Sequence, residues 1–157
     1  MALTPAQQAT LKAHILASTD QAVIDARAIR NDTELTRLYN LPSAVNVWQT
    51  MVSEDTFLDS YVFTEMDSVN AAKQFQLELL LKRGWLDASR PTVRAGLAEV
   101  FKGASLAATR AAILEAIKRP ATVAESIFVV DAGTGATKNL AWQGTLTTDD
   151  VGRAMNG

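Results

Sequence analysis

Apolar residues recur at three- and four-residue spacing along most of the chain, which is the pattern of amphipathic helices. The first helix is predicted to begin at Pro5, because Thr4 and Gln7 form a capping box around a proline in the first helical position. Its buried face continues through Leu11 and Ile15. The chain therefore opens with a helix whose start is set by local side chains.

The following stretch has a less regular pattern. Helical spacing predicts a second helix over residues 21–30, and either residue of Asp32-Thr33 can cap a short turn after it. A further helical piece is predicted from Ser43, because apolar residues recur there at helical spacing (Val47, Trp48, Met51 and Val52). Residues 56–64 suit either a short strand or an aromatic-rich turn and are expected to be mostly loop.

The middle of the chain carries the strongest helical signals. Residues 68–83 are rich in helix-forming side chains, and Gly84 follows where a left-handed C-terminal cap is expected. Residues 89–103 show the clearest amphipathic stripe. Another helix is predicted from Ser105 until Pro120 ends or kinks it, with a brief helical continuation beyond.

The composition changes near the C-terminus. Residues 131–139 form a small, polar, glycine-containing run that predicts a flexible turn. Its flanks, residues 127–130 and 140–144, can pair as a hairpin. Thr147 or Thr148 can then cap a last short helix.

These patterns predict one compact, mainly α domain: a helical bundle of about five helices with a C-terminal β-hairpin or extended arm. The helical body is expected to cover residues 1–126. The hairpin or arm is expected to cover residues 127–157 and not to be an independent domain.

Composition narrows the class of protein. The chain has 157 residues and a formal net charge of −2, and its Lys and Arg are scattered, so direct reading of a DNA sequence is not expected. No cysteine is present, which excludes disulfides, thiolate metal sites and a thiol nucleophile. No apolar run reaches the roughly 20 residues that span a bilayer, and the N-terminus does not resemble a signal peptide, so a cytoplasmic product is expected.

No catalytic, cofactor-binding or metal-binding set can be assembled from the sequence. The Gly133–Lys138 loop lacks the spacing of a P-loop and the three glycines of a dinucleotide fingerprint. His14 has no ligand partners nearby, which predicts a surface or interface role. Carboxylate pairs such as Glu54-Asp55 and Asp149-Asp150 are explained by solvated faces and helix starts. The chain is therefore not expected to be an enzyme.

Two groups of residues are candidates for binding a partner. The first is Trp142, a large aromatic residue beside the glycine-containing run. Its side chain is expected to anchor this segment either on the chain's own domain or on another subunit, and the first alternative is favoured. The second group consists of basic residues: the Lys118-Arg119 pair, Arg110 and the Lys82-Arg83 pair. These side chains could line a channel or contact an acidic protein surface. Alternatively, they reflect the preference of cations for helix C-termini. The last interpretation is favoured.

Several stretches spread over nearly the whole chain resemble small proteins of tailed-bacteriophage genomes. They are residues 3–12, Val47-Trp48, residues 90–96, 108–114 and 118–122, and residues 144–151. Together they resemble products of virion structure and assembly genes. A helical body with a C-terminal arm resembles in particular the head–tail connector, or adaptor, class.

The resemblance implies a structural protein of the virion neck that is assembled in the bacterial host cytoplasm. Connector proteins of this class form a ring, commonly of twelve copies, beneath the portal and let DNA pass. They insert C-terminal segments into the portal, so the resemblance implies that residues 127–157 dock there. The implied partners are the portal protein, other neck or tail proteins, and further copies of the chain, with no membrane and no cofactor. The expected partner interface is Phe128, Val130, Leu140, Trp142, Leu146 and Val151, and the expected channel-facing residues are Lys118 and Arg119.

A second class stays open, namely a small monomeric phage regulatory or inhibitory protein that binds one protein partner. In that class the C-terminal arm packs against its own body. Under the connector hypothesis, by contrast, deletion of residues 131–157 is expected to abolish ring or portal binding while the body stays folded.

Overall fold

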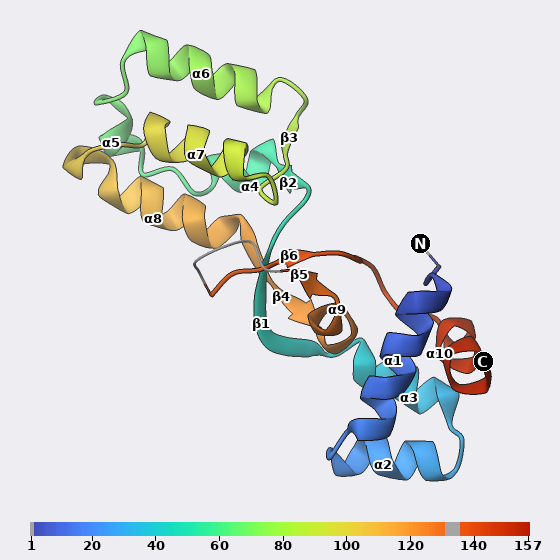
Figure 1. Ribbon diagram of the computed structural model, residues 1–157. Helices are drawn as coiled ribbons and strands as arrows, with labels where there is room; N and C mark the ends of the chain where they lie inside the picture. The colour runs from blue at the N-terminus through green and yellow to red at the C-terminus, as the bar shows by residue number, and fades with distance from the viewer. Residues whose placement is uncertain (1, 131–135) are drawn as a thin grey trace. The chain divides into compact units, whose positions relative to one another are not determined.

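The computed structural model describes residues 2–130 and 136–157, which form two compact units. Unit 1 comprises residues 1–46 and 120–157, and unit 2 comprises residues 47–119. Each unit has its own apolar core. The chain passes from unit 1 into unit 2 within β1 (Pro42–Trp48) and returns within β4 (Lys118–Thr122), and these two strands pair (Figure 1).

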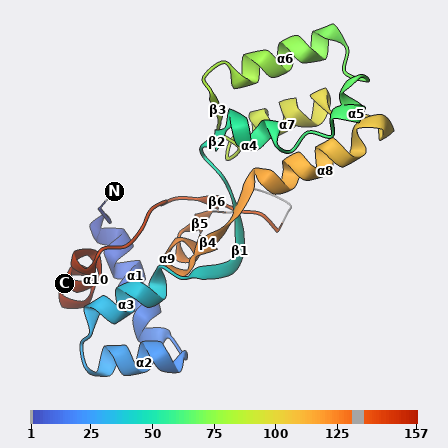
Figure 2. The ribbon, with the colours of Figure 1, turned by 180° about the vertical axis from the view of Figure 1, so that it is seen from behind.

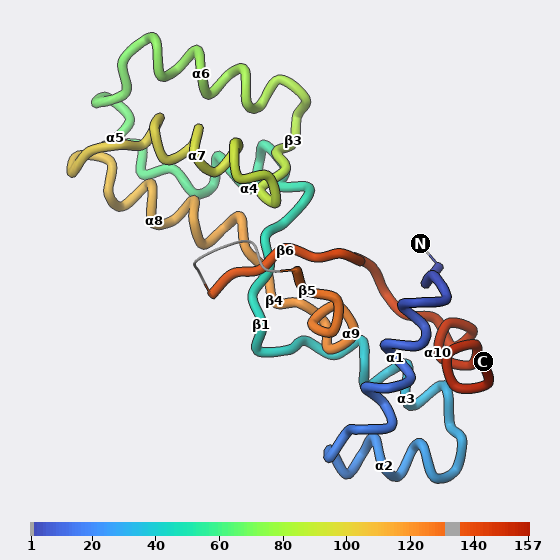
Figure 3. The backbone as a smooth tube through the Cα atoms, in the orientation of Figure 1, coloured from blue at the N-terminus to red at the C-terminus, as the bar shows by residue number. Residues whose placement is uncertain are grey.

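Unit 1 is built from both ends of the chain, as the trace in Figure 3 shows. Its helices are α1 (Pro5–Ala17), α2 (Gln21–Ala28), α3 (Asp32–Tyr39), α9 (Val123–Ile127) and α10 (Thr148–Asn156). α10 packs against α1 and α3, and α2 packs against α3. The core that they share includes Leu11, Ile15, Leu35, Tyr39, Val151 and Ala154.

Side chains fix the starts of the unit 1 helices. Thr4 and Gln7 form the predicted capping box at α1, and Thr147 caps α10 in the same manner. At α3 the cap is Asn31, whose side chain accepts the N–H of Glu34 at 3.0 Å, in place of the predicted Asp32-Thr33. The local signals thus set these starts to within a residue.

The predicted C-terminal hairpin is confirmed in position, although each strand has only two residues. β5 (Val129–Val130) pairs antiparallel with β6 (Asn139–Leu140), with Val129 opposite Leu140. The Ala141 N–H also donates to the Phe128 carbonyl oxygen at 2.8 Å. Most of the predicted flexible turn, including Gly133 and Gly135, lies outside the described residues.

Unit 2 consists of helices with one short strand pair. Its elements are β2 (Val52–Ser53), α4 (Glu54–Leu58), α5 (Phe63–Met66), α6 (Ala71–Leu81), β3 (Trp85–Leu86), α7 (Pro91–Val100), a 3-10 turn (Ala104–Leu106) and α8 (Ala107–Ala116) (Figure 2). β2 and β3 are antiparallel, α6 packs against α7, and α4 packs against α8. The core includes Phe57, Leu77, Leu81, Leu97, Phe101 and Ile113.

The helices α5 and α8 cap one another. The first N–H groups of a helix have no partner within it, and neither α5 nor α8 has a side-chain cap at its own N-cap residue. The Val62 N–H donates to Thr109 Oγ1 at 3.1 Å, while the Glu65 carboxylate accepts the N–H groups of Thr109 at 2.8 Å and Ala108 at 3.2 Å. The bond from the Thr109 N–H is the main cause that lowers the pKa of Glu65.

Strands replace helix in two predicted places. The helix predicted from Ser43 is wrong, because residues 42–48 form β1 and pair with β4. The helix predicted to run to Pro120 ends at Ala116, because residues 118–122 form β4. Residues 56–64, expected to be mostly loop, contain most of α4 and the start of α5. The spacing of apolar residues within a segment does not depend on which distant segment pairs with it. The sequence pattern therefore could not predict that β1 and β4 pair.

The mainly helical fold class is confirmed, but the five-helix bundle is wrong. Within the described ranges the chain forms ten α-helices, from four to thirteen residues long, together with small two-stranded sheets. The two compact units divide at residues 46/47 and 119/120. The C-terminal segment therefore belongs to the core of unit 1 and is not an appended arm.

Leu146 tests this placement, because it is 2% exposed in the unit 1 core. We expect Leu146→Ala to lower the free energy of unfolding by about 2–5 kcal/mol, since the truncation removes buried methyl groups and leaves a cavity. Thermal and urea unfolding followed by circular dichroism measure this loss. The matched control is Leu16→Ala in α1, where the side chain is 51% exposed and a change within about 0.5 kcal/mol is expected. Equal effects of the two variants would contradict the burial of the C-terminal segment.

Candidate functional site

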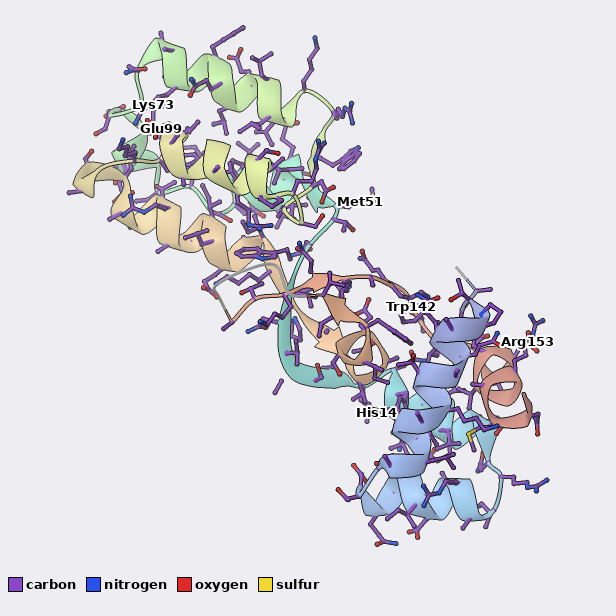
Figure 4. All side chains as sticks on the ribbon, in the orientation of Figure 1. His14, Met51, Lys73, Glu99, Trp142 and Arg153 are labelled. Carbon is purple, nitrogen blue, oxygen red and sulfur yellow. The ribbon has the colours of Figure 1, made fainter. Side chains whose placement is uncertain are left out.

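Four of the six expected interface residues are buried in the core of unit 1. Phe128, Trp142, Leu146 and Val151 are 7%, 3%, 2% and 0% exposed, respectively. The rings of Phe128 and Trp142 meet edge to face, with centroids 5.6 Å apart. Trp142 (labelled in Figure 4) therefore anchors its segment on its own unit, which was the favoured alternative. In this conformation these four side chains offer almost no surface to a partner.

The other two expected interface residues lie in the hairpin. Val130 is 44% exposed at the end of β5, and Leu140 is half-buried in β6. Of the predicted interface, these two side chains keep accessible apolar surface. The structure does not gather the six residues into one exposed patch.

The expected channel residues, Lys118 and Arg119, are both half-buried. The Lys118 ammonium lies 2.6 Å from a carboxylate oxygen of Glu115 and 5.9 Å from the ring centroid of Trp48. The Arg94 guanidinium lies closer to the same ring, 4.6 Å from its centroid, and also donates to two backbone carbonyls. Trp48 is thus a local packing site for cations, which the sequence did not indicate.

His14 contacts its own unit. Its Nδ1 lies 2.9 Å from the Tyr39 hydroxyl oxygen, and the two rings meet edge to face. Burial, reinforced by the charge of Asp20, raises the pKa of Tyr39 to about 12, so the phenol stays protonated at neutral pH. His14 is exposed on α1 (Figure 4), in keeping with the predicted surface position.

Metal ligands and membrane-spanning helices are two further features of the described ranges. In the part of the chain that the structure describes, His, Asp and Glu do not gather in groups of three or more that can hold a metal ion. Within the same ranges, no helix is both long and apolar enough to cross a membrane. The candidate surfaces are therefore hollows on the two units.

Large apolar side chains are exposed on α6, and this is the feature that the sequence analysis missed. Phe75 is 60% exposed and Leu79 is 53% exposed, one helical turn apart on the same side of α6. On the other side, Leu77 and Leu81 fill the core. The signal was present in the sequence, because residues 71–81 contain more apolar side chains than one buried face requires.

Two hollows flank this exposed side of α6. The first, here called the apolar groove, has a volume of about 380 Å³ and is lined by Gln76, Leu79, Leu80, Gly96 and Glu99. The second, here called the basic groove, has a volume of about 270 Å³, and its lining includes Leu79, Leu80 and Trp85 together with Lys82, Arg83 and Arg90. Leu79 and Leu80 line both grooves, so they form one continuous surface.

Unit 1 has a separate hollow between α1 and α10, with a volume of about 460 Å³. It is lined mainly by small side chains such as Ala9 and Ala13, with Leu16 and Arg153 at its border. Arg153 (Figure 4) is held by an ion pair of 2.7 Å with Asp149. This hollow therefore offers fewer large apolar groups and fewer unpaired charges than the α6 surface.

No protein-family model, no curated protein and no solved structure matches this chain.

The carboxylate of Asp150 gives a test of the C-terminal segment. It accepts bonds from the Thr147 N–H at 3.0 Å and the Thr147 Oγ1 at 2.7 Å, and from the Leu3 N–H. Burial raises its pKa, but these bonds together outweigh burial and lower the pKa below its usual 3.8. Its contribution to stability is therefore complete above pH 3.8 and is lost as the pH falls through the lowered pKa.

We expect Asp150→Asn to destabilise the protein by about 1–2 kcal/mol at pH 7 and to flatten the loss of stability below pH 4, because the variant has no carboxylate to protonate. Thermal unfolding at pH 7 and at pH 3 measures both effects. Asp149→Asn is the control, since the Asp149 side chain is 69% exposed and its ion pair with Arg153 contributes little. A variant with unchanged stability at both pH values would contradict this role of Asp150.

Proposed function

We propose that this chain is a structural assembly protein of a tailed-phage virion, most closely in the class of head–tail connector adaptors that form a ring beneath the portal and let DNA pass. The observation that carries the proposal is the exposed apolar surface of α6, where Phe75 and Leu79 are 60% and 53% exposed beside two grooves. Contiguous apolar side chains on a surface are typical of sites that bind other proteins.

The hydrogen bonds of three carboxylates support a binding role for the chain over a catalytic role. Glu65, Glu125 and Asp150 each accept backbone N–H groups at helix starts, as caps do. A general acid or base must instead face a hollow in which a substrate fits. None of these three residues lines the grooves of α6. These three carboxylates are therefore engaged in holding the fold, while Asp87 and Glu99 are the carboxylates that line the grooves of α6.

The burial of the C-terminal segment changes the expected mode of assembly. A segment that supplies Trp142, Leu146 and Val151 to its own core cannot insert into a portal without opening unit 1. The proposal therefore assigns the contacts between subunits to the α6 surface of unit 2. Val130 and Leu140 remain candidates for contact with the portal.

One observation favours the second candidate function, a monomeric regulatory or inhibitory protein that binds one protein partner. In that class the C-terminal segment packs on its own body, and here it does so within unit 1. The α6 surface would then bind the single partner. The two functions differ in oligomeric state and in presence in the virion.

The test is to purify virions from a phage whose genome encodes the chain and to localise the chain by mass spectrometry and immunogold labelling. The connector function predicts labelling at the neck and a stoichiometric copy number, because every particle carries one ring. Sedimentation of the purified chain is expected to show a defined oligomer. Absence of the chain from particles, with a monomer in solution, would overturn the connector function and favour the regulatory one.

A further inference from the structure

Unit 2 separates its charges along the sequence. Residues 47–72 contain five carboxylates and no Lys or Arg, whereas residues 73–119 contain nine Lys and Arg against four carboxylates. The first part thus has an excess of five negative charges and the second an excess of five positive charges, and unit 2 as a whole is neutral. Two copies of such a unit are electrostatically complementary where each part presents exposed charges on an element of its own.

Three of the nine cations of the positive part lie at the basic groove. Leu79, Leu80 and Trp85 supply its apolar lining, and Lys82, Arg83 and Arg90 are exposed at its border. Among the described residues, these three cations form no ion pair. Asp87 is the one carboxylate that lines the groove, and it already accepts the N–H and the hydroxyl of Ser89. The groove therefore presents three cations against one carboxylate around an apolar centre, an excess of positive charge.

The negative part has an exposed counterpart on α4. Asp55, Leu58 and Asp59 are spaced three and four residues apart, so they share one side of this helical turn. All three are exposed, with Leu58 at 39%, while Phe57 points into the core. This acidic face places one apolar side chain between two carboxylates.

We propose that the basic groove of one copy binds the acidic face of α4 of a second copy. The proposal rests on the proposed function and names its subunit interface. Leu58 of one copy enters the apolar centre formed by Leu79 and Trp85, and Asp55 and Asp59 pair with the cations at the border. The second copy uses its own basic groove for a third copy, so the contact is head to tail and closes into a ring when the rotation permits.

Repulsion between like charges disfavours a two-fold symmetric interface between two copies. Two basic grooves facing each other would bring six cations together, and two acidic faces would bring four carboxylates together. Only the groove-to-face arrangement pairs opposite charges. The two surfaces also have different neighbours within one copy, because α6 packs on α7 and β3 while α4 packs on β2 and α8. Figures 1 and 2 show α6 and α4 as separate elements of unit 2.

The experiment measures self-association of the full chain by sedimentation velocity in low and high salt. Arg83→Glu with Arg90→Glu reverses the groove, and Asp55→Lys with Asp59→Lys reverses the acidic face. Each double variant alone is expected to weaken association at least about tenfold, because like charges then face each other. High salt is expected to weaken association of the wild-type chain.

Mixing the two double variants provides the decisive result. Each variant keeps one native surface, and the two reversed surfaces complement each other, so the mixture is expected to associate where each variant alone does not. A chain that carries all four substitutions is expected to associate with itself. Failure of both rescues would overturn the proposed interface.

The matched control is Lys73→Glu with Lys102→Glu, which makes the same change in net charge at positions of unit 2 outside the basic groove. It is expected to associate as the wild-type chain does, and circular dichroism shows whether each variant is folded. If the control dissociates as strongly as the groove variant, net charge and not the groove governs association, and the proposal fails. If the wild-type chain is a monomer at all concentrations, the proposed interface is overturned, whereas the virion localisation still decides the proposed function separately.

Discussion

The packing of α10 against α1 and α3 is the contact on which unit 1 depends. It joins the two ends of the chain in one core, with Val151 fully buried among residues of the first helices. Residues 47–119 are consequently an insertion within unit 1. The chain leaves and re-enters through β1 and β4, which pair, so the two ends of the insertion are held together. A large insertion is tolerated when its ends are close, because joining them then costs little additional chain entropy.

Two carboxylates, one buried and one half-buried, link elements that are distant in the sequence within each unit. Glu125 is 2% exposed, and it accepts the N–H groups of Thr122 at 3.0 Å and Gly144 at 3.2 Å, which ties α9 to the segment before α10. Glu65 joins α5 to α8 in unit 2 in a similar way. Each of these bonds supplies an acceptor to a backbone N–H group that would otherwise lack a partner. Because the acceptor is a charged carboxylate, the bond stabilises the fold more than a bond to a neutral acceptor would. The acidic residues therefore divide into those that maintain the fold and those, such as Asp55 and Asp59, that remain exposed.

The two units differ in how far their aromatic side chains are buried. In unit 1 the aromatic side chains Tyr39, Phe128 and Trp142 are buried. In unit 2, Phe63 and Phe75 are 73% and 60% exposed, although the core contains other aromatic residues. Exposed aromatic side chains increase the apolar area in contact with water, whereas the large apolar side chains that unit 1 exposes, such as Ile29 at 74%, are aliphatic. This difference in exposed aromatic side chains is the reason that the proposed subunit contacts are assigned to unit 2.

Local sequence patterns were enough to predict the helical class, the capping box at Thr4, a cap at Thr147 or Thr148, the left-handed cap at Gly84 and the position of the hairpin. Each of these depends on side chains within a few residues of the element they control. Only the tertiary structure decided that β1 and β4 are strands, that the C-terminal segment completes the core of the first helices, and that Phe75 and Leu79 stay exposed. Those outcomes depend on which distant segments meet, because an apolar side chain has the same local pattern whether a core or a partner covers it.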